Sequence, residues 1–241
     1  NKGMSVGSQL LIADYNNDKV LDIYIPDNGQ THQSKGYRDS YYLSQPNGTW
    51  IESSNTHLSD NYFIAYSHGG ATGDIDNDGD MDVVLTDWGT FWCLMNDGSG
   101  FLTKRKCGGS NAFGLELADM DNDGDLDAIF GGHEHGGDGF PTGIYWNDGQ
   151  GNFITYDTTP LKQYRDKWGT IPEVSASDLD NDGDLDLVTN NLNEKASIYQ
   201  NNARELLKHN FVKIKFTIGV FNYRYIVFII LNSFPIIHTS K

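Results

Sequence analysis

The stretch from Asp119 to Phe130 reads DMDNDGDLDAIF and places five aspartates within nine residues, directly before a run of apolar residues. Close copies begin at Asp74 (DIDNDGDMDVVL) and Asp178 (DLDNDGDLDLVT), and a looser copy, DYNNDKVLDIYI, begins at Asp14. Like charges at this spacing repel one another, so each segment requires something that offsets the repulsion. These four segments therefore determine both the expected fold and the expected chemistry.

The acidity of the chain is local. The 241 residues carry a formal net charge of −16, and the four segments hold more than half of the 33 acidic residues. This distribution indicates bound cations rather than a generally acidic, solubilising surface. The first 200 residues contain no basic stripe, so nucleic acid is not an expected partner.

The acidic segments begin 45 to 60 residues apart, a spacing that indicates a repeat architecture. Each is preceded by one short β-type run and followed by another, and then by an aromatic-rich hairpin with an Asn-Gly or Asp-Gly turn in the first three copies. The expected first strands lie at 8–14, 69–74, 114–119 and 173–178, the second at 21–27, 82–87, 127–132 and 186–191, and the hairpins at 41–52, 91–103, 143–156 and 197–216. Four antiparallel strands per repeat are typical of a propeller blade. The sequence therefore predicts an all-β chain whose residues 1–216 form a β-propeller of four recognisable four-stranded blades.

The acidic loops have the pattern of an oxygen-lined cation site. With Asp119 as position 1, aspartates occupy positions 3, 5, 7 and 9, and Gly124 occupies position 6. Alternate side chains of a tight loop converge, the glycine permits the bend, and position 7 can turn its carbonyl inward. Hard anionic ligands in a flexible loop suit Ca²⁺ better than Mg²⁺ or zinc. The predicted ligands of up to four Ca²⁺ ions are Asp14, Asn16, Asp18, Val20, Asp22, Asp74, Asp76, Asp78, Asp80, Asp82, Asp119, Asp121, Asp123, Asp125, Asp127, Asp178, Asp180, Asp182, Asp184 and Asp186.

Two alternatives exist for these loops. An EF-hand opens with the same pattern but needs a bidentate glutamate at position 12 and flanking helices. The residues found at position 12 are Ile25, Leu85, Phe130 and Thr189, so EF-hands are excluded. Solvated Asp-rich turns without metal are a simpler interpretation, which three near-identical copies disfavour.

The first loop departs from the other three. Asn16 replaces an aspartate at position 3, and Lys19 replaces the glycine at position 6. Lys19 must adopt the backbone conformation of the glycine, or the loop must change shape. We therefore expect the first site to be the weakest.

The pattern D-x-D-N-D-G-D-x-D before a strand, with a later N-D-G-x-G-x-F hairpin, resembles the FG-GAP/VCBS repeat family of calcium-binding β-propellers, which includes integrin α-subunit heads, several lectins and bacterial surface proteins. The N-D-G turns lie at 96–98 and 147–149, and aromatic-glycine pairs that enter a repeat lie at 113–114 and 168–169. The resemblance covers roughly residues 5–216.

The resemblance implies that calcium loops lie on one face and are mainly structural, whereas ligands use loops of the opposite face. Those loops are 28–40, 55–68, 88–90, 107–113, 132–142, 158–172 and 191–196. Family propellers usually close with seven blades. The four counted here leave open an incomplete domain, completion by another chain or a small ring.

Six residues of these loops are candidate ligand-binding residues: Trp88, His133, His135, Asp138, Arg165 and Trp168. Two histidines beside carboxylates can hold a transition metal or accept a proton, although a glycine-rich surface loop with locally bonded histidines is the simpler interpretation. The tryptophans can stack on sugar rings beside an arginine, although packing between blades is the simpler role. The sequence contains no nucleophile elbow, phosphate loop or zinc-protease motif, so catalysis has little support.

Two further features are the cysteine pair and residues 217–241. Cys93 and Cys107 allow one disulfide in a secreted protein, a question the sequence leaves open. Residues 217–241 are apolar and basic, and the apolar run 225–237 is too short for a membrane span and is expected to form a strand pair or an edge segment.

The sequence as a whole predicts an extracellular calcium-binding module for adhesion or recognition of a glycan or protein ligand, open to assembly with further blades or chains. Extracellular calcium would saturate even modest sites. A lyase-like, polysaccharide-active enzyme and a structural subunit of a surface assembly are the alternatives.

Overall fold

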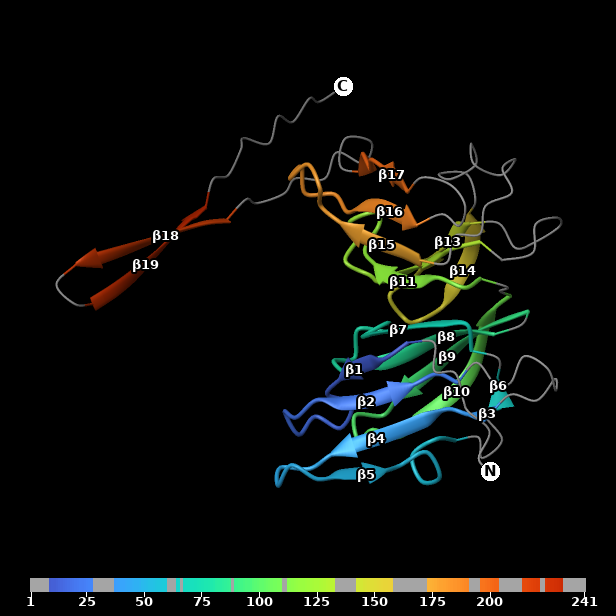
Figure 1. The fold of residues 1–241 in the computed structure, drawn as a ribbon. Helices are drawn as coiled ribbons and strands as arrows, with labels where there is room; N and C mark the ends of the chain where they lie inside the picture. Colours follow the sequence, from blue (N-terminus) through green and yellow to red (C-terminus); the bar gives the residue numbers. More distant parts are fainter. Residues whose placement is uncertain are drawn as a thin grey trace. The chain divides into compact units, whose positions relative to one another are not determined.

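The computed structural model describes residues 9–27, 37–59, 64–65, 67–87, 89–109, 112–132, 142–157, 173–190, 196–203, 214–221 and 224–231. The chain divides into two compact units, Asn1–Ala203 and Arg204–Lys241. Every element named within the described residues is a β-strand, which confirms the all-β prediction (Figure 1). The domain boundary expected between 216 and 217 falls inside β18 (Ile214–Phe221) of the second unit.

The first unit contains four antiparallel sheets, one for each acidic repeat. Sheet 1 has the order β1 (Leu11–Ala13), β2 (Asp22–Ile25), β4 (Ser40–Ser44), β5 (Trp50–Glu52). Sheet 2 has the order β7 (Gly69–Gly73), β8 (Asp82–Asp87), β9 (Thr90–Asn96), β10 (Leu102–Gly108). Sheet 3 has the order β11 (Leu115–Ala118), β12 (Asp127–Phe130), β13 (Gly143–Asn147), β14 (Phe153–Asp157). Strands β3 (Tyr37–Arg38) and β6 (Ile64–Ala65) form a separate pair.

The fourth sheet differs from the predicted four-stranded unit. It has three described strands, β15 (Glu173–Ser177), β16 (Asp186–Asn190) and β17 (Ser197–Tyr199). The hairpin expected at 197–216 begins as β17, but its last residues belong to β18, which pairs with β19 (Arg224–Leu231) instead. Between them, residues 204–213 lie outside the described part.

The first strands of successive sheets are neighbours. β1 lies against β7, β7 against β11, and β11 against β15, so the sheets follow one another in chain order (Figure 1). In each sheet the first strand pairs with the second so that the acidic loop connects them, as Ala13 opposite Asp22 and Gly73 opposite Asp82 illustrate. All four acidic loops therefore occur at the same point of the repeated unit.

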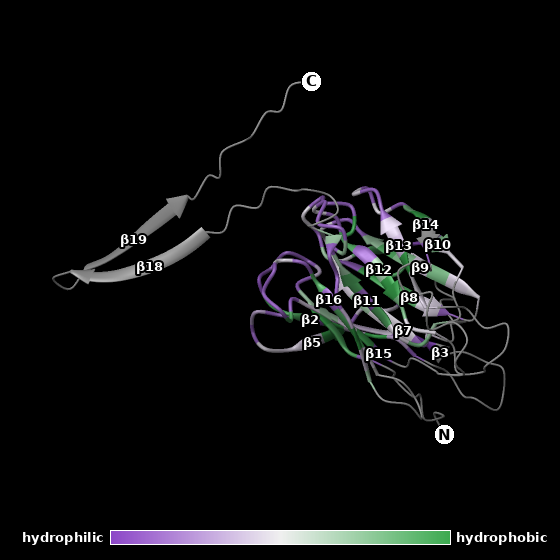
Figure 2. Ribbon diagram, turned by 90° about the horizontal axis from the view of Figure 1, so that it is seen from above, coloured by the Kyte–Doolittle hydropathy of each residue, from purple (hydrophilic) through white to green (hydrophobic). Residues whose placement is uncertain are grey.

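The core consists of apolar layers between consecutive sheets, and the strands are accordingly more hydrophobic than the loops in Figure 2. In the layer between sheets 1 and 2, the rings of Tyr15 and Tyr41, both from sheet 1, meet edge to face with centroids 5.6 Å apart and pack in one cluster with Leu85 of sheet 2. Between sheets 2 and 3, Phe91 meets Phe130 with centroids 4.9 Å apart. Burial of each such ring contributes about 1.5–3 kcal/mol, so the sheets hold one another through these layers.

A disulfide links Cys93 on β9 with Cys107 on β10, with 5.9 Å between their Cα atoms. It joins neighbouring strands of sheet 2 and contributes to the layer shared with sheet 3. The question that the cysteine count left open is therefore answered in favour of a bond.

The second unit contains the antiparallel pair β18 and β19, whose register runs from Ile214 opposite Leu231 to Phe221 opposite Arg224. Residues 225–231 of the apolar run thus lie in β19, which is one strand of the expected pair. No helix within the described ranges has the length and apolar character needed to cross a membrane.

Gly69 on β7 tests how closely sheets 2 and 3 approach. A Cβ atom at Gly69 would lie 2.3 Å from the carbonyl oxygen of Phe113, whereas one at Gly109 would lie 3.8 Å from its nearest neighbour. We expect Gly69→Ala to lower the free energy of unfolding by about 1–3 kcal/mol, because the added methyl group would overlap the backbone at Phe113 and force the two segments apart. Gly109→Ala is the matched control, and equal effects of the two in urea denaturation would contradict this packing.

Asp39 gives sheet 1 a pH dependence. Its buried carboxylate accepts hydrogen bonds from the Tyr24 hydroxyl and the Asp27 amide, both at 2.7 Å. Burial raises its pKa from 3.8 to about 7, so the folded chain binds the proton more tightly than the unfolded chain. The resulting stabilisation is complete below about pH 4 and is lost as the pH rises through about 7.

Asp39→Asn removes this titration while keeping the shape of the side chain. Urea denaturation between pH 5 and pH 8 should show the wild type losing stability relative to Asp39→Asn. A constant difference between the two proteins across this range would show that Asp39 does not titrate there.

Candidate metal centres

Each acidic loop is wound around the carboxylate at position 1. Asp74 accepts hydrogen bonds from the amides of Asp78 (3.1 Å) and Gly79 (3.0 Å), and Asp119 does the same for Asp123 and Gly124. Gly79 has φ of 96°, the left-handed conformation that the bend requires. The loop is therefore preformed by its own backbone, and its remaining carboxylate oxygens are turned toward a common centre.

Three of the four loops bring carboxylate oxygens together. In each, one oxygen from each of three aspartates lies within 4.8 Å of the others. The three sets are Asp74, Asp76 and Asp78 in the second loop, Asp119, Asp121 and Asp127 in the third, and Asp178, Asp180 and Asp186 in the fourth. Each set could hold a metal ion, and all of its members are among the predicted ligands.

The donor sets fit a hard cation. Burial, followed by the charges of Asp78 and Asp74, raises the pKa of Asp76. The Oδ1 atoms of Asp76 and Asp178 are buried and have no hydrogen-bond partner among the described residues. A buried carboxylate oxygen without a partner is costly, and a cation would satisfy it while offsetting the repulsion.

The aspartate at position 9 ties the loop to the sheet. Asp82 accepts hydrogen bonds from the amide of Ile75 in the loop (3.1 Å) and from the amide of Asn96 on the third strand (2.7 Å). Burial raises the pKa of Asp82 to about 7. The same pair of bonds recurs at every repeat, made by Asp22 with Tyr15 and Ser44, Asp127 with Met120 and Asn147, and Asp186 with Leu179 and Asn201.

The position-7 carboxylates of loops 2, 3 and 4 each accept a hydrogen bond from the side chain of an asparagine in the preceding loop. The amide Nδ2 of Asn17 donates to Asp80 (2.7 Å), that of Asn77 to Asp125 (2.8 Å), and that of Asn122 to Asp184 (2.8 Å). At Gly98 an added Cβ would lie 2.6 Å from Asp80, so the turn glycine makes room for this carboxylate. Sequence reasoning assigned no role to these asparagines, although their recurrence at position 4 was visible.

A second asparagine crosses each junction from the hairpin turn. Asn96 donates through Nδ2 to the carbonyls of Tyr15 (2.8 Å) and Met81 (2.9 Å). Asn147 donates to Ile75 and Leu126, and Asn201 donates to Met120 and Leu185. Each turn asparagine therefore joins its own loop to the loop of the preceding sheet.

The first loop keeps its shape but forms no three-carboxylate set among the described residues. Lys19 has φ of 69°, so the lysine does adopt the left-handed conformation that a glycine supplies in the other copies. Asn16 at position 3 is uncharged, unlike the aspartates of the other loops. Its side-chain amide donates a hydrogen bond to Asp18 (3.2 Å). These features support the expectation of a weak first site.

The predicted ligand-binding residues Trp88, His133, His135, Asp138, Arg165 and Trp168 all lie outside the described residues.

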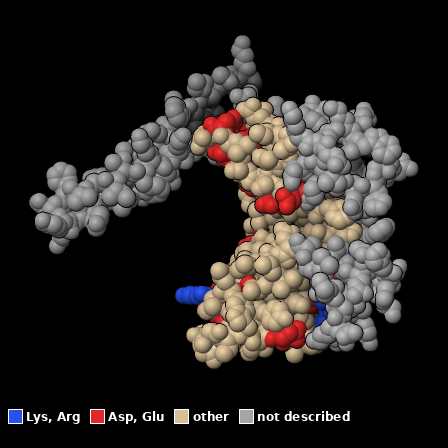
Figure 3. Space-filling model, viewed as in Figure 1, with Lys and Arg blue, Asp and Glu red and all other residues tan. Residues whose placement is uncertain are grey.

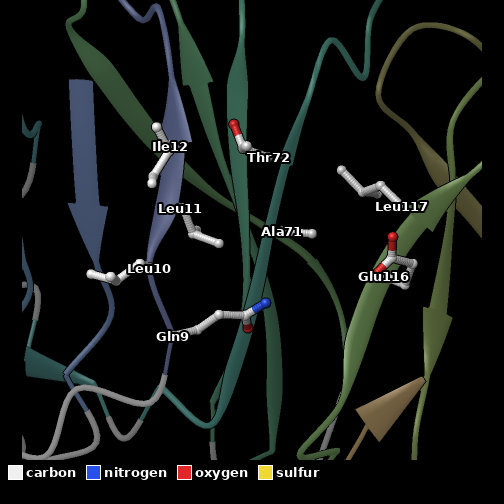
Figure 4. Close-up of a pocket in the computed structure, with 8 residues that line it drawn as sticks. All are labelled: Gln9, Leu10, Leu11, Ile12, Ala71, Thr72, Glu116 and Leu117. Carbon is white, nitrogen blue, oxygen red and sulfur yellow. The ribbon is translucent and has the colours of Figure 1, made fainter. Parts of the chain in front are cut away.

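The described residues form an open groove of about 330 Å³ beside the first strands β1, β7 and β11 (Figure 4). Gln9, Thr72 and Glu116 provide its polar groups, and burial raises the pKa of Glu116. Figure 3 shows the acidic side chains of the described residues in separate patches on one face of the molecule.

Comparisons with known proteins agree with the repeat and the fold. A family model described as an FG-GAP-like repeat matches residues 14–85, 74–130 and 135–206. No curated protein matches the sequence significantly.

The solved structures that are similar to the chain include a lectin and a biofilm matrix protein. One is a lectin of Agrocybe aegerita, described as specifically recognising non-reducing terminal N-acetylglucosamine, with a TM-score of 0.51 and 17% identity over 78% of this chain and 48% of the lectin. The other is the V. cholerae biofilm matrix protein Bap1, with a TM-score of 0.47 and 21% identity over 77% of this chain and 28% of Bap1. The chain thus spans about half the length of the lectin, and at this identity the likeness to the lectin is one of fold.

Asp127 tests the role of position 9. Asp127→Asn leaves one acceptor for two amide donors and turns an NH₂ group toward one of them, so we expect a loss of about 1–3 kcal/mol in the free energy of unfolding. Asp148→Asn in the exposed turn of the same sheet is the control, because an asparagine oxygen can still cap that turn. Urea denaturation of both variants in EDTA separates this effect from metal binding, and similar losses would rule out a special role for Asp127.

Proposed function

The chain belongs to the FG-GAP-like repeat family, and on that premise we propose that it is a calcium-stabilised β-propeller module for recognition or adhesion outside the cell. The observation that carries the proposal is the set of three carboxylate clusters, two of which include a buried oxygen without a hydrogen-bond partner among the described residues.

Calcium is the ion that the donor chemistry favours. All candidate side-chain ligands in the three clusters are carboxylates, which are hard oxygen donors, and no thiolate or imidazole belongs to any cluster of described residues. The residues that would hold the ions are those predicted in loops 2, 3 and 4, with the first loop as a fourth, weaker site. A bound Ca²⁺ would supply charge neutralisation and a rigid link between the two strands on either side of the loop.

A propeller is the arrangement that the sheet order supports. The first strands follow one another in chain order, and each sheet runs outward from its first strand. The chain spans about half of the lectin of similar fold. Further sheets would then be needed for a full ring.

A glycan is the first ligand to test, with a protein ligand as the second. The lectin of similar fold recognises a terminal sugar, which motivates the choice, and the groove by β1, β7 and β11 offers carboxylate, amide and hydroxyl groups of the kind that bind sugar hydroxyls. The disulfide and the demand for calcium both suit an extracellular location. The polysaccharide-active alternative depended on His133 and His135, which lie outside the described residues, and we do not propose it.

Calcium titration tests the proposal. Isothermal titration of the chelator-treated chain should show calcium uptake at millimolar concentration, together with a rise in melting temperature that EDTA reverses. Asp76→Asn and Asp121→Asn should each remove about one bound ion, because each weakens one cluster. Asp18→Asn should change the uptake least, since the first loop lacks a carboxylate set.

Absence of calcium uptake by the folded chain would overturn the metal assignment. Glycan-array binding is the separate test of recognition: signals that depend on Glu116 would place the ligand in the groove, and a silent array in saturating calcium would direct attention to protein ligands.

A further inference from the structure

Two glycines of the hairpin turns lie at the junctions between consecutive sheets. Gly100 of sheet 2 and Gly151 of sheet 3 are both buried, and each follows the asparagine of its turn by four residues. The carbonyl of Gly100 accepts a hydrogen bond from the hydroxyl of Tyr41 in sheet 1 (3.1 Å). The carbonyl of Gly151 accepts one from Nη2 of Arg105 in sheet 2 (2.6 Å). The two junctions therefore use the same acceptor but different donors.

Both glycines also lie beside position 3 of the preceding acidic loop. A Cβ atom at Gly100 would lie 3.3 Å from the Cβ atom of Asn16, which occupies position 3 of the first loop. A Cβ atom at Gly151 would lie 3.5 Å from the Cβ atom of Asp76, at position 3 of the second loop, and 2.5 Å from Nη2 of Arg105. The guanidinium and the Asp76 side chain therefore flank the same glycine.

The charges at the two junctions are matched. Where position 3 is the uncharged Asn16, the donor to the glycine is a neutral phenol, and where position 3 is Asp76, the donor is a guanidinium. By register, sheet 3 has Asp157 at the place that Arg105 occupies in sheet 2. The arginine is therefore a property of one junction and not of the repeat.

Arg105 and Asp76 each contain a buried polar atom without a hydrogen-bond partner among the described residues. These atoms are Nε of Arg105 and Oδ1 of Asp76. Burial raises the pKa of Asp76 and the charges of Asp78 and Asp74 raise it further, whereas the positive charge of Arg105 lowers it. A buried donor and a buried acceptor of opposite charge are costly when apart and favourable when paired.

We propose that Arg105 is a built-in counter-ion of the second acidic loop. When the loop is empty, its guanidinium neutralises part of the charge of Asp76 and holds the loop against the hairpin turn of sheet 3. Arg105 also opposes calcium, which would need the same Asp76 oxygen. The second site therefore binds calcium more weakly than the third, and its loop depends less on calcium for its structure. The calcium half of this inference rests on the proposed function, whereas the counter-ion half does not.

Loops 2 and 3 of the wild type provide the first test. Their patterns, DIDNDGDMD and DMDNDGDLD, carry the same aspartates, so a difference in affinity comes from the surroundings of the loops. Hydrogen exchange over 74–82 and 119–127 during a calcium titration gives one midpoint for each loop. We expect loop 2 to need about tenfold more calcium, because a nearby positive charge repels a divalent cation. Equal midpoints, or a lower one for loop 2, would overturn the proposal, whether or not any variant folds.

Arg105→Gln removes the counter-ion, and Lys106→Gln is the matched control. Lys106 is the next residue of β10, is exposed and lies on the opposite side of the sheet. In EDTA, Arg105→Gln should speed exchange over 74–82 about tenfold, because the charge of Asp76 is no longer offset. In the calcium titration, the same variant should lower the midpoint of loop 2 about tenfold. Lys106→Gln should match the wild type in both measurements.

The opposite directions of these two effects separate a counter-ion from a simple tether. If Arg105 only held the hairpin turn through Gly151, its loss would loosen the loop and weaken calcium binding as well. A midpoint of loop 2 that rises or stays unchanged in Arg105→Gln would therefore overturn the proposal.

A double-mutant cycle with Asp76→Asn identifies the partner of Arg105. In the Asp76→Asn background, Arg105→Gln should no longer speed exchange over 74–82 in EDTA, because no charge at position 3 remains to be neutralised. An effect as large as in the wild-type background would show that Asp76 is not the partner and would overturn the proposal.

The proposed function and this inference fail in different ways. If calcium protects neither loop, the calcium assignment is wrong, and the EDTA comparison alone decides whether Arg105 is a counter-ion. If calcium protects 119–127 but Arg105→Gln leaves the midpoint of 74–82 unchanged, the calcium assignment is supported and the role of Arg105 is refuted.

Discussion

The buried carboxylate at loop position 9 is the interaction on which each sheet depends. Asp82 and its three equivalents accept one amide from the loop and one from the end of the third strand or from just beyond it, so a single side chain fixes the loop relative to two strands. In an apolar layer such a group is stabilising only when its hydrogen bonds are made. We expect the position to tolerate little change, because the same carboxylate also belongs to the three-carboxylate cluster of the loop in repeats 3 and 4.

The loops combine two kinds of organisation. Backbone amides bound to the position-1 and position-5 aspartates set the shape of each loop, as Gly79 on Asp74 and Asp80 on Asp78 illustrate. The remaining oxygens are left close together and partly desolvated, an arrangement that favours a cation. Links between loops then use asparagines rather than charges, so neighbouring sites are connected without adding to the repulsion.

Much of this was predictable from particular residues. Position 12 carries strand formers instead of glutamate, which separated these loops from EF-hands, and the structure places Ile25, Leu85, Phe130 and Thr189 in strands. The junction asparagines were not predicted, because their partners are 48 to 81 residues away and only the assembled sheets bring them together. The last hairpin was misplaced because the β-type residues 214–216 were taken as the partner of the run at 197–199, whereas they pair with β19.

The asparagine-to-aspartate link has a consequence for how such chains lengthen. Every complete repeat carries one donor at position 4 and one acceptor at position 7. Tandem duplication of a repeat in the gene therefore adds both halves at once, and deletion removes both, so the neighbours on either side can pair again without leaving a polar group stranded. The number of sheets can therefore change by duplication or deletion of whole repeats, whereas loss of the position-7 aspartate, as at Val20 in the first loop, removes the acceptor of one such link.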